Sequence, residues 1–335
     1  KVTVSVLYWE VIMSLDGDLV DISVLSSVQP QVQSKLTRLL LLVHRSLQQV
    51  LPGHSIVPYG SFCTGTMHRA SVTIDMTVIG FSDESVAAAI AFEELQRIPC
   101  ISVERTLPRV PHTQSAVCVH HHDWAVGATL SFHQTQLVRS TGMLSAAMHF
   151  IPQAAPMTIF LKDLARRHQL GCDVITSHVI AVSVVGFINA VRAGSLPLDS
   201  ELVVSSEPTL AHLVHGYCSF FSSPEFVASP ANFLIESDGV FRCSEPSSPT
   251  LWKVLDPVSR RNVAEHCIAI GRFQQVLADV DRDIRVRYTR EGQRKPGAAH
   301  LLQICPGWTN ADSSSSVGDA PGSFPVVSLE MPDDE

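Results

Sequence analysis

The stretch from Tyr59 to Ile79 constrains this chain most, because a tight turn there leads directly into an alternating strand. Gly60 permits a close backbone approach that a Cβ atom would block. Ser61 and the backbone N–H groups after it can cradle a phosphate at the start of a helix. The strand then has three alternating polar positions, at Thr73, Asp75 and Thr77. One strand face is therefore polar, and a two-metal phosphoryl-transfer site would lie on such a face beside such a turn.

The composition bounds the class of protein. The chain has 335 residues, of which 45% are hydrophobic and 17% charged, so we expect a packed body of two domains. The net charge of −8 argues against a strongly basic nucleic-acid binder, so any RNA contact needs a local patch. The 8 cysteines are scattered without a Cys-x-x-Cys pair, which indicates reduced thiols in an intracellular protein. No apolar run approaches the length of a membrane span, and we expect no membrane partner.

The Tyr59–Ile79 stretch resembles the signature of the DNA polymerase β-like nucleotidyltransferases, of the poly(A) polymerase and terminal uridylyltransferase type. That signature is Gly-Ser, a Thr-Gly pair and a strand carrying Asp-x-Asp. Gly60-Ser61 and Thr64-Gly65 match it, but one carboxylate of the pair is missing. If Asp75 is the second aspartate, the first is Thr73; if Asp75 is the first, the second is Thr77. The family's third carboxylate, on an Asp-x-Ser-Phe-Asn strand, corresponds to Thr129.

The order of the predicted elements fits this resemblance. We expect helices at 31–51 and 85–97 and strands at 54–58, 73–79, 101–107, 116–120 and 125–132. Helices follow at 155–170, 174–191, 208–221 and 262–283, with a hairpin within 226–241 turned at Asp238-Gly239. The predicted fold is an α/β nucleotidyltransferase lobe at 1–145 and a mainly helical, poly(A)-polymerase-associated lobe at 146–305, with a cleft between them. Residues 306–335 are expected to form a flexible tail with an acidic end.

The resemblance also implies residues that would contact a nucleotide: Gly60, Ser61, Lys162, Ser177, His178 and Asn262. His178 stands where the family usually has a tyrosine that stacks on the base, and an imidazole stacks less well. The plainer interpretation is that Ser61 caps its turn and Lys162 is a solvated helix residue.

Two further clusters have a functional and a plain interpretation. His120, His121 and His122 suggest a metal, but neighbouring strand residues point to opposite faces and cannot converge on one ion, which favours a polar loop or edge. A basic run near the end of the last helix is equally consistent with an RNA or acidic-protein contact and with a solvated helix end. Its residues are Arg285, Arg287, Arg290, Arg294 and Lys295.

The missing carboxylates decide the predicted function. A threonine hydroxyl is neutral and a weak ligand for a hard divalent ion, so Asp75 alone should not hold two metals. We expect a catalytically inactive nucleotidyltransferase-like protein, acting as a scaffold or RNA-contacting subunit of a ribonucleoprotein assembly for RNA processing, editing or ribosome assembly. The alternatives are an active terminal uridylyl- or adenylyltransferase with relocated carboxylates, such as Asp83 or Asp123, and a nucleotide-binding sensor.

The expected ligands and partners follow from that function. No cofactor is expected; Mg²⁺ and a nucleoside triphosphate would bind only if the site is active. RNA and a larger protein complex are the expected partners, and the mitochondrion is the expected compartment. The apolar helices at 179–187 and 210–221 exceed what one small core needs, which predicts surface buried against partners.

Overall fold

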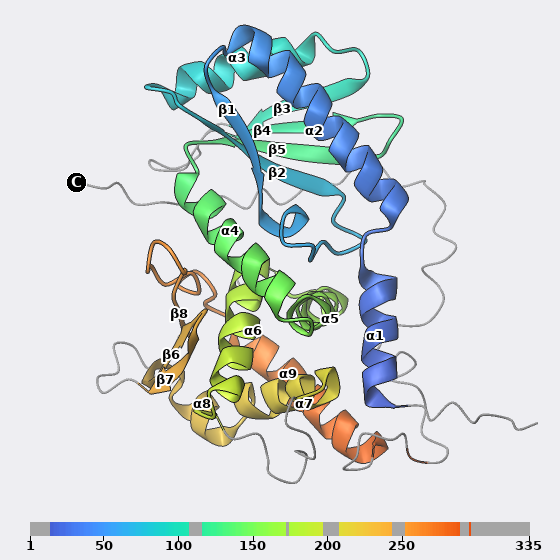
Figure 1. Ribbon diagram of the computed structural model, residues 1–335, viewed down its shortest axis with the longest axis vertical. Helices are drawn as coiled ribbons and strands as arrows, with labels where there is room; N and C mark the ends of the chain where they lie inside the picture. The colour runs from blue at the N-terminus through green and yellow to red at the C-terminus, as the bar shows by residue number, and fades with distance from the viewer. Residues whose placement is uncertain are drawn as a thin grey trace, which may run out of the picture.

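Two separate hydrophobic cores organise the molecule. The computed structural model describes residues 14–106, 116–171, 174–196, 208–242, 252–288 and 295. One core joins α2, α3 and the strands β1–β5, which we call the sheet lobe, and the other joins α1, α4–α9 and β6–β8, which we call the helical lobe. Figure 1 shows the sheet lobe at the top and α4 (Thr135–Phe150) running down from it into the helical lobe.

The sheet lobe is a mixed five-stranded sheet in the order β1-β2-β5-β4-β3. β2 and β5 are parallel neighbours, and the other pairs are antiparallel. Its strands are β1 (Ser55–Tyr59), β2 (Thr73–Ile79), β3 (Ile101–Thr106), β4 (Ala116–His121) and β5 (Val126–Phe132). The helices α2 (Pro30–Val50) and α3 (Glu84–Gln96) contact each other and pack on the sheet (Figure 1). The predicted order of helix, turn, strand, helix and strands is confirmed.

The helical lobe surrounds an aromatic-rich core that includes Tyr217, Phe221 and Trp252. Its remaining elements are α5 (Ala154–Arg167), α6 (Ser177–Arg192), α7 (Leu210–Phe221), α8 (Pro224–Ala228), β6 (Phe233–Glu236), β7 (Gly239–Arg242), β8 (Lys253–Val254) and α9 (Gly271–Arg287). α6 passes so close to β6 that a Cβ on Gly186 would lie 2.0 Å from the Glu236 carbonyl oxygen. The apolar sides of α6 and α7 are buried in this core, so the prediction that they are reserved for partners is wrong.

The structure differs from the sequence-based boundaries at three places. The helix predicted at 262–283 begins only at Gly271, because residues 255–264 form a loop closed by a hydrogen bond from the Asp256 N–H to the Arg261 carbonyl (2.9 Å). The β6–β7 hairpin turns at residues 237–238, and Gly239 already pairs with Glu236. An unpredicted helix, α1 (Leu15–Ser26), packs in the helical lobe although it precedes the sheet lobe.

The predicted domain boundary at 145 falls inside α4, which contributes to the helical core. The predicted tail at 306–335, together with Arg290 and Arg294 of the basic run, lies outside the described residues. Among the described helices none is by itself long and apolar enough to cross a membrane; α4 and α5, bent by 113° at their junction, pass that test only as a pair.

Candidate functional site

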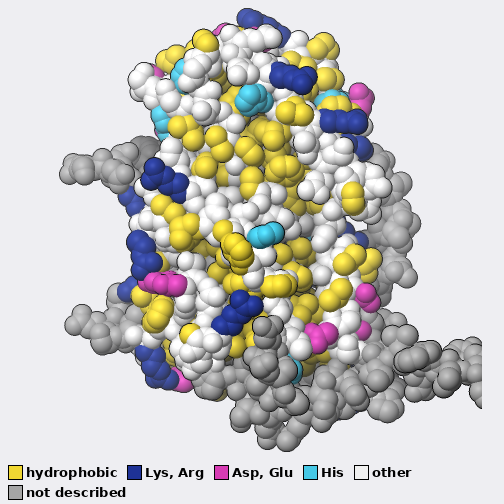
Figure 2. All heavy atoms as spheres, viewed as in Figure 1, with side chains coloured by type: hydrophobic (Ala, Val, Ile, Leu, Met, Phe, Trp, Pro, Cys, Tyr) yellow, Lys and Arg dark blue, Asp and Glu magenta, His cyan; other side chains and the backbone are white. Residues whose placement is uncertain are grey.

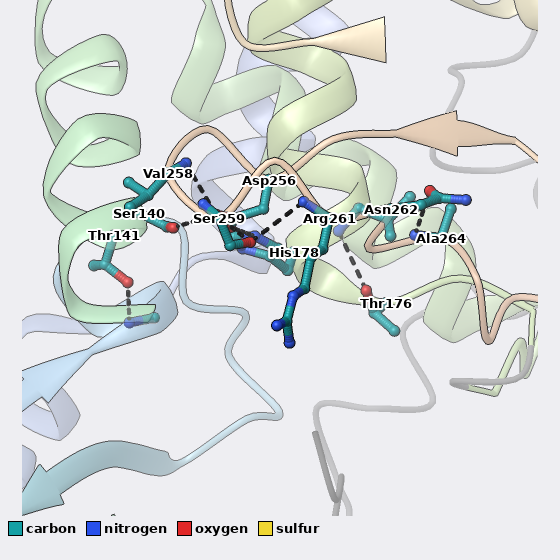
Figure 3. Close-up of polar contacts among 12 residues, drawn as sticks. Ser140, Thr141, Thr176, His178, Asp256, Val258, Ser259, Arg261, Asn262 and Ala264 are labelled. Atoms are coloured by element: carbon teal, nitrogen blue, oxygen red, sulfur yellow. Dashed lines mark hydrogen bonds and ion pairs between the residues drawn. The ribbon is translucent and has the colours of Figure 1, made fainter. Parts of the chain in front are cut away.

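The signature turn follows β1 directly and is fixed by the strand behind it and by α4. Gly60 begins the short 3-10 helix η1 (Gly60–Phe62) with φ +73°, a conformation that favours glycine. A Cβ there would lie 3.2 Å from Oδ2 of Asp75. The Gly60 N–H donates a hydrogen bond to Oγ1 of Thr141 on α4 (3.0 Å), one of the contacts drawn in Figure 3. The turn is therefore held against the carboxylate strand, as the signature predicts.

The strand register places Asp75 directly beside Thr129. These two residues are partners in the parallel β2–β5 pair, and Thr73 is the partner of Gly127 in the same register. Thr73, Asp75 and Thr129 are all partly exposed, while their sequence neighbours Ile74 and Ala128 are buried. These three polar residues therefore lie on one side of two adjacent strands.

Thr77 differs from Thr73, Asp75 and Thr129 in its burial. Its side chain is fully buried, and its Oγ1 accepts a hydrogen bond from the Gln134 N–H (3.1 Å). Of the two threonines, Thr73 is therefore the one that shares the partly exposed side of β2 with Asp75.

The charges around Asp75 are poorly solvated. Burial raises the pKa of Asp75 to about 6, and the nearby positive charge of Lys162 limits the rise. Burial lowers the pKa of Lys162 to about 8, and Asp75 opposes that fall. Tyr59, the partner of Asp75 in β1, has its pKa raised to about 12 by burial and then by the Asp75 charge. No described residue forms a hydrogen bond with the Asp75 carboxylate.

Lys162 is a buried residue, so the plain interpretation of it as a solvated helix residue is wrong. Its Nζ atom donates to the carbonyl (3.1 Å) and to Oγ1 (3.0 Å) of Thr66. Thr66 Oγ1 in turn shares a hydrogen bond with Thr64 Oγ1 (2.8 Å). Two of the three ammonium donors are thus used to hold the segment after the turn, which leaves at most one for a phosphate.

Asp163, the next residue on α5, was not singled out by the sequence. It accepts from His68 Nε2 (2.8 Å) and from Arg167 Nε (2.5 Å), and these contacts hold its pKa below the usual range although burial works against them. Because His68 Nδ1 accepts the Ala70 N–H (3.1 Å), the ring carries its proton on Nε2 and is neutral. Lys162 and Asp163 together fasten the segment from Thr64 to Ala70 to α5.

A second carboxylate, Asp256, lies where α4 and α6 meet the loop after β8 (Figure 3). Its Oδ1 accepts hydrogen bonds from Ser140 Oγ (2.7 Å), from the N–H groups of Val258 (3.0 Å) and Ser259 (2.7 Å), and from Ser259 Oγ (3.1 Å). Its Oδ2 is 2.9 Å from Nε2 of His178. Burial alone would raise the pKa of Asp256, but these hydrogen bonds outweigh it and lower the pKa.

The remaining residues implied for nucleotide contact, Ser177, His178 and Asn262, lie in different surroundings. Ser177 is exposed at the first turn of α6, and its neighbour His178 is partly exposed and bound to Asp256. The Asn262 amide is occupied by backbone: Oδ1 accepts the N–H groups of Val254 (2.9 Å) and Ala264 (3.1 Å), and Nδ2 donates to the Trp252 carbonyl (3.1 Å). Asn262 therefore shapes the loop, and Figure 3 shows it directed away from Thr141 and the signature turn.

The residues around Asp75 do not fit a pair of divalent metals. Among the described residues there is no group of three or more His, Cys, Asp or Glu side chains that could hold a metal ion. Asp83, proposed as a relocated acid, caps α3 through the Ser85 N–H (2.9 Å) and the Val86 N–H (3.1 Å). Asp75 is left with threonine hydroxyls in place of carboxylates.

The histidine run contains a buried residue rather than only a polar loop. His121 lies inside β4, is 3% exposed and stacks on Trp124 with ring centroids 3.7 Å apart. His120 and His122 are 6.4 Å apart, ring centroid to ring centroid. The expectation of a loop or edge is therefore wrong for His121, because β4 lies between β5 and β3.

Comparison with known proteins identifies the architecture. No protein-family model and no curated protein matches the chain. The Cid1 poly(U) polymerase with MgGTP bound superimposes with a TM-score of 0.69 and 14% identity, over 85% of this chain and 96% of that one. A cytoplasmic RNA terminal U-transferase gives a TM-score of 0.66 and 15% identity, over 81% and 92%. Cid1 with the UTP analog UMPNPP gives 0.65 and 15%, over 81% and 93%.

At these identities the likeness establishes the fold and leaves the chemistry to the residues themselves. The turn, the β2–β5 register and the helical lobe are all present, and two of the three expected carboxylates are threonines. The chain has the fold of a polymerase β-like nucleotidyltransferase of the poly(A) polymerase and terminal uridylyltransferase type.

Proposed function

We propose that this chain is a nucleotidyltransferase-fold protein without transferase activity, which serves as an RNA-contacting scaffold subunit of a ribonucleoprotein assembly. The observation that carries the proposal is the register of Asp75 with Thr129. Where a transferase would assemble carboxylates around two metals, this chain has one carboxylate of raised pKa and two neutral hydroxyls. Lys162, the remaining charged group, is bonded to Thr66.

Retention of the whole fold without the metal ligands favours a binding role. RNA is the natural candidate, since the Cid1 structures include one with the short product ApU. Several large apolar side chains are strongly exposed and can serve protein contacts: Phe150 (77%), Ile268 (77%) and Val24 (66%). RNA processing, RNA editing and ribosome assembly are the settings in which such a subunit would act.

The direct test is an RNA primer-extension assay with each nucleoside triphosphate, in Mg²⁺ and in Mn²⁺. We expect no extension by the wild-type protein. A matched variant, Thr73→Asp with Thr129→Asp, restores three carboxylates on the two strands. We expect Mg²⁺ to raise the Tm of that variant and to leave the wild type unchanged, because only the variant can hold the ion. Extension by the wild type that is lost in Asp75→Asn would overturn the proposal.

The RNA-contacting part is tested separately. A labelled single-stranded RNA should bind the wild type without any divalent metal, and Asp75→Asn should bind it equally well. Absence of RNA binding by the wild type would contradict this part of the proposal while leaving the missing activity in place.

A second candidate is nucleotide binding without transfer. It is favoured by the exposed Ser177 and by the Ser61 hydroxyl, which forms no hydrogen bond among the described residues. A Tm increase with UTP or ATP that disappears in Ser61→Ala would support it; an unchanged Tm would exclude it.

A further inference from the structure

One helix departs from the charge balance of the rest of the chain. α2 (Pro30–Val50) carries Lys35, Arg38 and Arg45 and contains no Asp or Glu. Every other described helix either contains an acidic residue or has at most one Lys or Arg. This excess of positive charge occurs in a chain whose net charge is −8. Such a local patch is what an acidic protein needs in order to bind a polyanion.

The helix presents its arginines opposite its buried side. Leu36, Leu39, Val43 and Leu47 are fully buried against the sheet lobe. Arg38 and Arg45 are exposed on the other side, seven residues apart, which is two helical turns or about 10.5 Å along the axis. Figure 2 shows Lys and Arg side chains, with an acidic side chain beside them, on the upper right of this face, where α2 runs in Figure 1.

These cations are not neutralised within the protein. None of Lys35, Arg38 and Arg45 forms an ion pair or hydrogen bond with a described residue. The basic run near the end of α9 is different, because its first member, Arg285, pairs with Asp281 (2.9 Å); the preceding Arg282 pairs with Asp279 (2.5 Å). The run that the sequence offered as an RNA contact is thus partly neutralised, whereas α2 is not.

We propose that the exposed side of α2, centred on Arg38 and Arg45, binds the phosphate backbone of RNA. The inference rests on the RNA-contacting role proposed above and locates it away from the Asp75 site. The surface suits a phosphate chain better than a protein partner. It contains cations and hydrogen-bonding glutamines, Gln48 and Gln49, has no exposed aromatic anchor, and its strongly exposed apolar residue is Leu41.

The experiment measures the affinity of the full chain for a labelled, unstructured single-stranded RNA of about 20 nucleotides over a range of salt concentrations. The test variant is Arg38→Gln with Arg45→Gln. The charge-matched control is Arg242→Gln with Arg282→Gln, which removes two exposed arginines that are paired with carboxylates on the helical lobe. Arg38→Lys with Arg45→Lys keeps the charge. Circular dichroism melting confirms that each variant is folded.

Each phosphate contact on a single strand contributes about 0.7 to the slope of log K against log salt. We therefore expect the Arg38/Arg45 glutamine variant to lower the slope by about 1.4 and to bind about 25-fold more weakly at 0.1 M salt. The lysine variant should keep the slope, and the helical-lobe control should stay within about twofold of the wild type.

The possible results of this experiment distinguish the α2 site from the RNA-contacting function proposed above. Wild-type RNA binding that is unchanged in the glutamine variant overturns the α2 site and leaves the RNA-contacting function standing. No RNA binding by the wild type overturns both. An acidic peptide, poly-glutamate of similar length, that binds α2 more tightly than the RNA would assign the surface to a protein partner and overturn the RNA site.

Discussion

Asp75 and Asp256 are two partly or fully buried carboxylates of one fold, and their surroundings are opposite. Asp256 is 3% exposed and accepts hydrogen bonds from α4, from its own loop and from His178 on α6, so its pKa is lowered. Asp75 has no hydrogen-bond donor among the described residues, and its pKa is raised to about 6. Hydrogen bonds offset the cost of burying the charge at Asp256, and none of the described residues supplies them at Asp75.

The difference between the two carboxylates separates contacts that join the lobes from groups at the Asp75 site. The groups that hold the two lobes together are satisfied: Thr141 with the signature turn, Lys162 with Thr66, and Asp163 with His68. At the Asp75 site, by contrast, Asp75 lies beside Thr73 and Thr129 and forms no hydrogen bond with a described residue. The fold is therefore stabilised by contacts at the junction of the lobes, and its retention does not require a working metal site.

The largest expected difference between the two sites is in the free energy of unfolding lost when each carboxylate is replaced by alanine. Asp256→Ala leaves several buried donors unpaired, and we expect a loss of about 3 to 5 kcal/mol in the free energy of unfolding. Asp75→Ala removes a poorly solvated charge that has no hydrogen bond to a described residue, and we expect a change within about 1 kcal/mol. Urea denaturation at pH 7 measures both; equal losses would show that the two sites are equivalent in stability.

The next largest loss of stability is expected when the Asp163 contacts are weakened. Asp163→Asn weakens the bonds to His68 and Arg167 at a site that is 2% exposed, and we expect a loss of about 3 kcal/mol. The control is Glu94→Gln, because Glu94 pairs with the exposed Arg97 and should cost less than about 1 kcal/mol. Urea denaturation and limited proteolysis of the 64–70 segment provide the readouts. A loss for Asp163→Asn no larger than for the control would show that this cluster does not hold the lobes together.

The contributions of Asp75 and Asp256 to stability should change with pH in opposite directions. Asp75 has a raised folded pKa, so its contribution to stability is present at low pH and is lost as the pH rises from about 4 to about 6. At this partly solvated group we expect about 1 to 2 kcal/mol, seen as the difference between wild type and Asp75→Ala in urea titrations. Asp256 has a lowered pKa, so its contribution is present above about 4 and is lost as the pH falls.

Lys162 provides a check on the same electrostatics. Its positive charge opposes the rise in the Asp75 pKa, so Lys162→Met should raise that pKa above about 6 in a ¹³C carboxyl NMR titration. An Asp75 pKa that is unchanged by this substitution would mean that the two charges do not share one environment.

The sequence predicted the parts of the fold that local pattern controls. The alternation at Thr73, Asp75 and Thr77 predicted the correct strand, and Thr129, matched to the family's third carboxylate, lies beside Asp75. The buried position of Lys162 could not be predicted, since its helical pattern is that of a solvated residue and Thr66 reaches it only in the folded chain.

The Asp256 cluster was hidden from sequence reasoning for the same reason. Its partner Ser140 is 116 residues away, and no periodicity links the two. The last helix was predicted to start at 262, but the Asn262 side chain bonds the backbone of a loop, and α9 begins only at Gly271. α1 was missed because it carries Asp16, Asp18 and Asp21 among its apolar residues.

The smallest expected effect is the difference in stability between Thr77→Val and Thr73→Val, which tests which threonine stands in place of the missing carboxylate. Thr77→Val keeps the β-branched shape but removes the acceptor for the buried Gln134 N–H, and we expect a loss of about 1 to 2 kcal/mol. Thr73→Val lies on the partly exposed side next to Asp75 and should change the free energy of unfolding by less than about 0.5 kcal/mol. Paired urea titrations measure the two. If Thr73→Val were the more harmful change, Thr73 would have a structural role, and its assignment as the position of the missing carboxylate beside Asp75 would fail.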